Sequence, residues 1–290
     1  MSKIQRRVLM IACSIVLGLG MAWALPFMAQ NSLAQNSIDV RVERWLQINS
    51  VSGEVQHFTA NSRNPAQVGD RLINAGDGIK TGANSACTLE VDINVGTITL
   101  SENTELTVRQ LDYAPDNGRI TKLAVNQGNV ILNLRRFTNR GSELEIETPS
   151  AVSGVRGTEF GLIVHPEDQR TAVATQQGEV FAAAQGRTVD VTAGLQTLVR
   201  VGEEPLEPMP IPERPRLDFM VEQEIRDNLR YLVLAGRINP INQVYVADEL
   251  QAVTEAGDFR YEVLAYHGAG VQVRVVTPLG DVEIYDISLF

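Results

Sequence analysis

The chain has 290 residues, 44% of them apolar, which is enough for one or two modest domains with a sizeable core and excludes wholesale disorder. Its formal net charge of −10 becomes about −13 without residues 1–34, which hold three basic groups and no acidic one. An acidic surface argues against nucleic acid and anionic lipid as main partners, because both require basic patches. We therefore expect no nucleic-acid partner.

Residues 1–34 have the layout of a secretory signal peptide. Three basic residues precede an apolar run from Val8 to Ala24, and Ser32-Leu33-Ala34 offers a cleavage site between small residues. The alternative is an uncleaved membrane anchor, because about 17 apolar residues can just span a bilayer. Both interpretations export the rest of the chain to the periplasm or cell envelope, and the second anchors it to the inner membrane through residues 8–24.

Cysteine usage excludes an internal disulfide in the exported protein. Only Cys13 and Cys87 occur, and Cys13 lies within the signal or anchor segment. The apolar neighbours of Cys87 favour a small buried residue over a reactive thiol.

Residues 38–202 read as many short strands. Apolar and polar residues alternate in 88–93, 144–147 and 189–192, and turn-forming residues separate these runs. This pattern predicts an all-β sandwich, roll or barrel. A polar-Gly-polar-Val step occurs three times, in Val51-Ser52-Gly53-Glu54-Val55, Asn126-Gln127-Gly128-Asn129-Val130 and Gln176-Gln177-Gly178-Glu179-Val180. Such repeats favour a solenoid-like β-roll.

The C-terminal part begins with a Pro-rich segment, 203–216, that predicts an extended, semi-rigid linker holding two units apart. A proline-rich docking peptide is the alternative, although such ligands usually carry basic residues and this segment is acidic. Residues 217–290 then predict a short amphipathic helix, because Leu217, Val221, Ile225 and Leu229 recur at intervals of four. Five or six strands follow and suit a small antiparallel sandwich.

A search for catalytic or ligand-binding spacings gives no catalytic, metal or cofactor residues, and we expect a protein that is not an enzyme. His57, His165 and His267 are far apart and lack metal-ligand spacing. No Gly-x-Ser-x-Gly elbow or phosphate-binding glycine loop is present. Calcium ligation by turn aspartates and an enzyme site on irregular loops are the alternatives left open.

The most informative stretch runs from Thr148 to Val164 and sets a glycine-containing corner between two short strands. Its glycines read as positions that allow a bend or a close approach. Arg156 is a charged group in a run suited to burial, and it must reach water or find a carboxylate. The candidate motif, structural or interacting, comprises Gly154, Val155, Arg156, Gly157, Thr158 and Phe160.

With this motif, residues 68–201 resemble the FecR domain. The segment opens with Val68-Gly69-Asp70-Arg71-Leu72 and Asp77-Gly78-Ile79-Lys80-Thr81-Gly82, and it closes with Gly178-Glu179-Val180 and Val189-x-Val191-x-Ala193-Gly194. The resemblance implies an extracytoplasmic all-β domain. Its best-known members relay a signal from an outer-membrane receptor to a sigma factor.

Two features depart from those members. Only Met1 to Arg7 could be cytoplasmic, which is too short to bind a sigma factor. The tail is instead similar to the Ig-like modules of glucodextranase-type surface proteins, with Phe259 after Gly257-Asp258, although the usual order in that motif is Asp-Gly-x-Phe.

These observations predict a non-enzymatic, exported envelope protein that binds an envelope protein or cell-wall glycan through its FecR domain. One alternative is a periplasmic accessory in FecR-like transmembrane signalling. The other is a pair of carbohydrate-binding modules, which exposed aromatic residues would favour, yet Trp45 is the only tryptophan beyond residue 34.

Overall fold

The computed structural model describes residues 43–155, 157–265 and 269–289. All regular secondary structure in these ranges is β-strand, which confirms the predicted all-β fold. No helix of the described part is long and apolar enough to cross a membrane. The signal or anchor helix predicted within residues 1–34 lies outside the described residues.

Two β-sheets make up the part of the chain before residue 211. Sheet A has the strand order β4 (Arg71–Leu72), β1 (Leu46–Ser52), β6 (Ala86–Val91), β7 (Gly96–Leu100), β9 (Arg119–Leu134), β12 (Glu159–Val164), β13 (Thr171–Gln177), β16 (Leu195–Val199) and β17 (Met209–Pro210). Sheet B has the order β3 (Arg63–Pro65), β2 (Val55–Phe58), β5 (Gly78–Thr81), β8 (Glu105–Tyr113), β9, β10 (Glu143–Glu147), β11 (Val152–Val155), β14 (Glu179–Ala184) and β15 (Arg187–Thr192).

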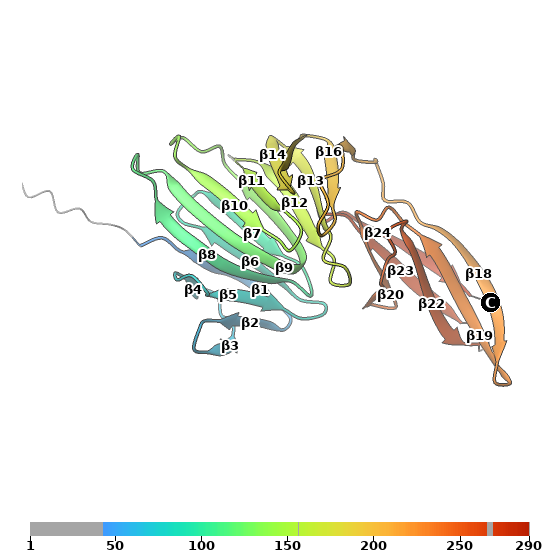
Figure 1. The fold of residues 1–290 in the computed structure, drawn as a ribbon. Helices are drawn as coiled ribbons and strands as arrows, with labels where there is room; N and C mark the ends of the chain where they lie inside the picture. Colours follow the sequence, from blue (N-terminus) through green and yellow to red (C-terminus); the bar gives the residue numbers. More distant parts are fainter. Residues whose placement is uncertain (1–42, 156, 266–268, 290) are drawn as a thin grey trace, which may run out of the picture. The chain divides into compact units, whose positions relative to one another are not determined.

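Strand β9, the longest strand in Figure 1, belongs to both sheets. Its first half pairs with β8 and, in parallel, with β10, whereas its second half pairs with β7 and β12. The alternating apolar side chains of both sheets meet in one core, in which Leu89, Leu123 and Phe160 are fully buried. Cys87 also lies in this core, as its neighbours predicted.

The three repeated polar-Gly-polar-Val steps are corners at which the chain passes from one sheet to the other. Gly53 joins β1 to β2, Gly128 lies at the change of sheet within β9, and Gly178 joins β13 to β14. Their φ angles are +74°, +96° and +86°, a region that residues with a Cβ rarely adopt. The repeated step therefore marks three positions at which the chain changes from one sheet to the other.

The Pro-rich segment lies along sheet A instead of forming a free spacer. Strand β17 pairs with β16, and the amides of Leu206 and Ile211 donate to the carbonyls of Leu198 and Gly194 at 3.0 and 2.9 Å. Proline lacks an N–H but is tolerated on an edge strand, where the residues between the prolines supply the donors.

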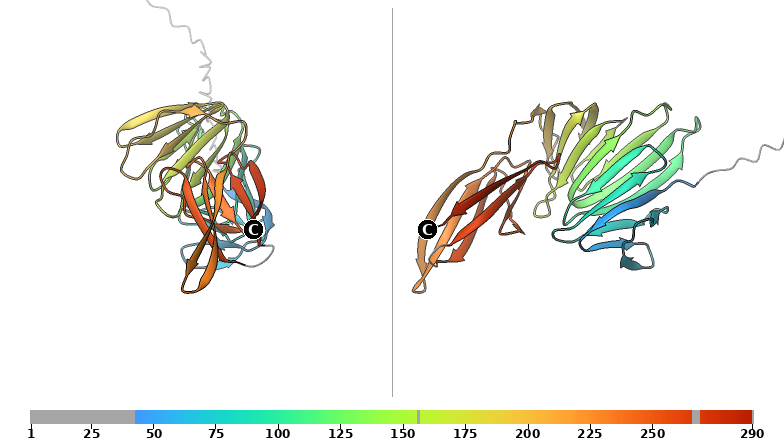
Figure 2. Two further views of the ribbon diagram at one scale, coloured as in Figure 1. Left: turned by 90° about the vertical axis from the view of Figure 1, so that its right-hand side faces the viewer. Right: turned by 180° about the vertical axis from the view of Figure 1, so that it is seen from behind.

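The strands between Asp218 and Ser288 form two antiparallel sheets around a second core, drawn in orange to red in Figures 1 and 2. Sheet C contains β18 (Asp218–Arg226), β19 (Leu229–Arg237) and β22 (Asp258–Leu264). Sheet D contains β21 (Glu249–Leu250), β20 (Gln243–Val246), β23 (Gly270–Val276) and β24 (Val282–Ser288). This arrangement is the predicted small antiparallel sandwich.

The predicted helix after residue 217 is wrong, because residues 218–226 form strand β18 and Leu229 begins strand β19. Residues at intervals of four share a face in a strand as well as in a helix. Asp227 and Asn228 both have positive φ, 51° and 60°, and form the tight turn of a hairpin that pairs β18 with β19 over nine residue pairs. Hairpin pairing therefore overrides the helical pattern.

Candidate functional site

The motif at residues 154–160 is a further corner between the sheets, where β11 of sheet B leads into β12 of sheet A. Gly157 has a φ of +96°, and a Cβ there would lie 2.2 Å from the Arg136 Cα atom. Such a contact with backbone cannot relax through a flexible side chain, so only glycine fits this position. Arg156 lies outside the described residues.

The neighbours of Gly157 hold this corner to both sheets. Val155 pairs with Leu144 on β10 and Val180 on β14, and Phe160 is fully buried in the core. The Thr158 carbonyl accepts a hydrogen bond of 3.0 Å from the Leu134 amide. These three motif residues therefore have structural roles, whichever partner the protein binds.

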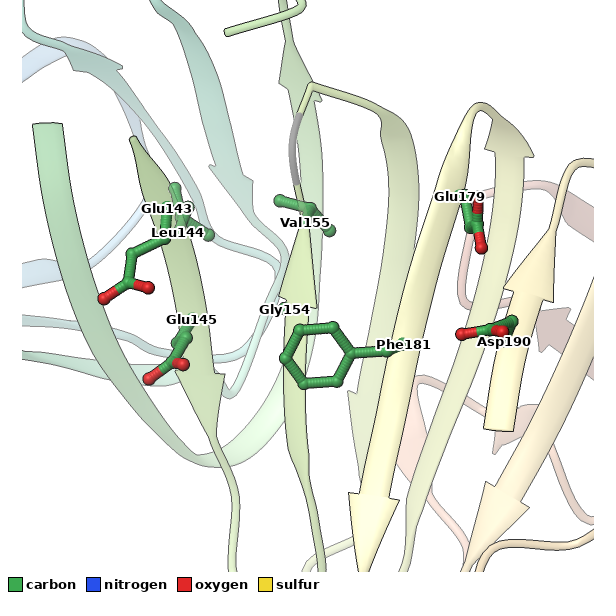
Figure 3. A pocket seen from close by; sticks show the side chains of 8 residues that line it. All are labelled: Glu143, Leu144, Glu145, Gly154, Val155, Glu179, Phe181 and Asp190. Carbon is green, nitrogen blue, oxygen red and sulfur yellow. The ribbon is translucent and has the colours of Figure 1, made fainter. Parts of the chain in front are cut away.

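Gly154 lies in a groove on the outer face of sheet B (Figure 3). A Cβ on Gly154 would lie 2.2 Å from two carbons of the Phe181 ring, so the absence of a side chain lets this ring reach across β11. The groove has a volume of about 330 Å³ and is lined by Glu143, Leu144, Glu145, Gly154, Val155, Glu179, Phe181 and Asp190.

Strand register explains how residues distant in sequence meet in this groove. Glu145 on β10 pairs with Gly154 on β11, Gly154 with Phe181 on β14, and Phe181 with Asp190 on β15. Lys122 on β9 extends the same row, since it pairs with Glu145 in the parallel ladder. One face of four adjacent strands thus carries an aromatic ring between carboxylates.

The groove is electrostatically negative. Lys122 Nζ lies 2.7 Å from a Glu145 carboxylate oxygen and 3.8 Å from a Glu143 oxygen. The hydrogen bond to Glu145 raises the pKa of Lys122 above its ordinary value. Glu179 and Asp190 are exposed, and within the described ranges their carboxylates form no ion pair. Among the described residues, one cation, Lys122, therefore faces four carboxylates.

A second polar cluster joins sheet A to the C-terminal sandwich. Arg170 is fully buried, and its guanidinium donates to the carbonyls of Pro240 and Val253, both at 3.2 Å, and to Asp168. Arg170 Nη2 lies 3.2 Å from His165 Nδ1, and His165 Nε2 has no hydrogen-bond partner within the described part of the chain. Burial, and secondarily the Arg170 charge, lowers the pKa of His165 to about 3.

Close packing accompanies this cluster at the same junction. Asn129 Nδ2 donates to the Thr277 carbonyl at 3.0 Å, and Arg274 Nη1 lies 2.8 Å from a Glu102 carboxylate oxygen. A Cβ on Gly161 would lie 1.8 Å from the Pro278 carbonyl oxygen. The turn after β23 therefore contacts the outer face of sheet A, and the absence of a side chain at Gly161 makes room for it.

The sequence patterns missed most of these residues. Arg170 follows Glu167-Asp168-Gln169 in what reads as a solvated turn, and no spacing links it to His165. Phe181 lies two residues after a recognised corner, but its ring position depends on Gly154, 27 residues earlier. The alternation in 144–147 predicted a strand, but it did not indicate that the outward-facing carboxylates would line a groove. Within residues 43–155, 157–265 and 269–289, no three potential ligands group around a metal position.

Comparison with known proteins identifies the domain that contains the groove. Residues 77–181 match the family model described as FecR protein, whereas comparison with curated proteins gives no match. Two crystal structures of a candidate anti-sigma factor from Parabacteroides distasonis ATCC 8503, at 2.50 and 1.65 Å resolution, align at 17% and 16% identity with TM-scores of 0.37 and 0.35. Each alignment covers 46% of this chain and 59% of that protein, so the chain spans less than two thirds of its length. Residues 77–181 are a FecR domain, as the sequence resemblance predicted.

Proposed function

We propose that this protein is a non-enzymatic accessory of cell-envelope signalling whose FecR domain acts as a protein-binding module. The FecR match at residues 77–181 carries the proposal. It favours the signalling alternative over the glycan-binding one, for which none of the comparisons gives support. The protein is exported, and its partner is another envelope protein.

Sheet B is the surface best suited to docking, because the other candidate surfaces are already in contact with the rest of the fold. The motif residues Gly157, Thr158 and Phe160 are used within the fold, so they are not free to contact a partner. Part of the outer face of sheet A is occupied by the junction at Gly161 and Asn129. The outer face of sheet B carries the open groove and is the surface offered to a partner.

The signalling role is tested by deleting the gene in its native host and comparing transcripts with a complemented strain. We expect a defined set of genes to change and to return to normal with the wild-type chain. An unchanged transcriptome, under conditions in which the protein is made, would refute the signalling role.

The docking surface is tested separately by photo-crosslinking in intact cells. A photoreactive amino acid replaces Thr188, which is exposed on β15 of sheet B, and, as the control, Asn61, which is exposed in the loop between β2 and β3. We expect one dominant protein partner from position 188 and none from position 61. Equal capture from both positions would contradict docking at the groove, because Asn61 lies at the opposite edge of sheet B, beside β2 and β3.

A further inference from the structure

The groove on sheet B has an aromatic floor whose position is fixed by the fold. The Phe181 ring extends from β14 over Gly154 on β11, as Figure 3 shows, and it is half-buried, so part of the ring remains accessible. Most outward-facing positions on these strands are polar or charged, whereas an accessible aromatic ring in a hollow favours binding of a ligand. The ring can contact an apolar or a cationic group.

The charges around the ring select between those two classes. Glu145 and Asp190 flank Phe181 in the same transverse row, and Glu143 and Glu179 line the hollow from β10 and β14. A cation above an aromatic face gains from the ring quadrupole, and surrounding carboxylates add Coulomb attraction. An anion would be repelled by the same groups.

The volume of the hollow suits a ligand as small as one long side chain. A volume of about 330 Å³ lies at the lower end of the range for small-molecule pockets. We propose that this groove binds a lysine or arginine side chain presented by a partner protein. The proposal rests on the proposed function, since it names the chemistry of the partner that docks on sheet B.

The test uses the isotope-labelled protein in the form in which its host cells produce it. The probes are the peptide acetyl-Gly-Ser-Arg-Ser-Gly-amide and its citrulline twin, which has the same shape without the charge. We expect the arginine peptide to shift the NMR signals of the Gly154 amide and the Phe181 ring saturably, and the citrulline peptide to leave them unchanged.

Two groove variants and a control variant test which side chains contribute to the affinity for the arginine peptide. Phe181→Leu should weaken arginine-peptide binding about threefold to tenfold, the range expected for a lost cation–π contact. Glu179→Gln combined with Asp190→Asn should weaken it by a similar factor and reduce its salt dependence. Glu255→Gln, at an exposed carboxylate in the C-terminal sandwich, should bind as the wild type does.

The proposal is overturned if the citrulline peptide binds equally well or if neither groove variant changes the affinity. It is also overturned if spermidine shifts the same signals with higher affinity than the arginine peptide, which would make the groove a polyamine site. If Phe181→Leu does not fold, the double amide variant, which alters only exposed side chains, decides. Failure of peptide binding with an altered transcriptome would leave the signalling role standing and place its contact elsewhere.

Discussion

Acidification should destabilise this protein through His165. The folded-state pKa of about 3 lies below the ordinary value of 6.5, so the unfolded chain takes up a proton first as the pH falls. The stability that neutral His165 provides is complete above pH 6.5 and is lost progressively as the pH falls from 6.5 toward 3. At pH 5.0 the difference of about 1.5 pH units corresponds to about 2 kcal/mol.

The assay is urea unfolding of the wild type and of His165→Asn between pH 7.5 and 5.0. Asparagine keeps an oxygen that can accept from Arg170, but it does not titrate, so other groups titrate equally in both proteins. We expect the wild type to lose about 2 kcal/mol more than the variant over this range. Equal losses would show that His165 is not held neutral beside Arg170, and the reasoning would fail.

Three further predictions concern the corner, the junction and the core. Gly157→Val should destabilise the FecR domain by about 2 kcal/mol or more in thermal unfolding, whereas Gly186→Ala, with positive φ but open space around it, should cost about 1 kcal/mol. Arg170→Met should cost about 3 kcal/mol, because it leaves the buried Val253 carbonyl and the partly buried Pro240 carbonyl without their donor; a loss below 1 kcal/mol would contradict the hydrogen bonds described. Burial raises the pKa of Cys87 to about 12, so the thiol should resist iodoacetamide at pH 8 until the protein unfolds, as mass spectrometry would reveal.

The FecR fold was predictable where backbone geometry restricts the residue type. At a corner with positive φ, glycine is strongly favoured, so Gly53, Gly128 and Gly178 left a repeated signal in the sequence. Alternation of polar and apolar residues identified strands for the same kind of reason, since one face of each sheet is buried. Which strands lie side by side was not predictable, because pairings such as β10 with the first half of β9 depend on the whole core.

The misreading of residues 217–229 has a similar cause. Residues four apart lie on the same face in a helix and in a strand, so this interval does not distinguish the two. The Asp227-Asn228 turn, which fixes a hairpin, was the decisive signal. The acidic linker likewise gave no indication that its amides would donate to the carbonyls of Gly194 and Leu198. In both segments the partner strand, not the local sequence, determines the structure.

The motif residues at the corner and the residues proposed to meet a partner differ in what the fold requires of them. Gly157 is fixed by a close backbone contact and Phe160 by full burial in the core. Glu179 and Asp190 lie on the exposed rim, where their carboxylates hold nothing in the fold together. Substitutions at the rim should therefore change partner binding and leave stability intact, while substitutions at the corner should do the reverse. Gly154 belongs to both groups. It pairs with Phe181 between β11 and β14, and because it has no side chain, the Phe181 ring can lie over it and form the floor of the groove.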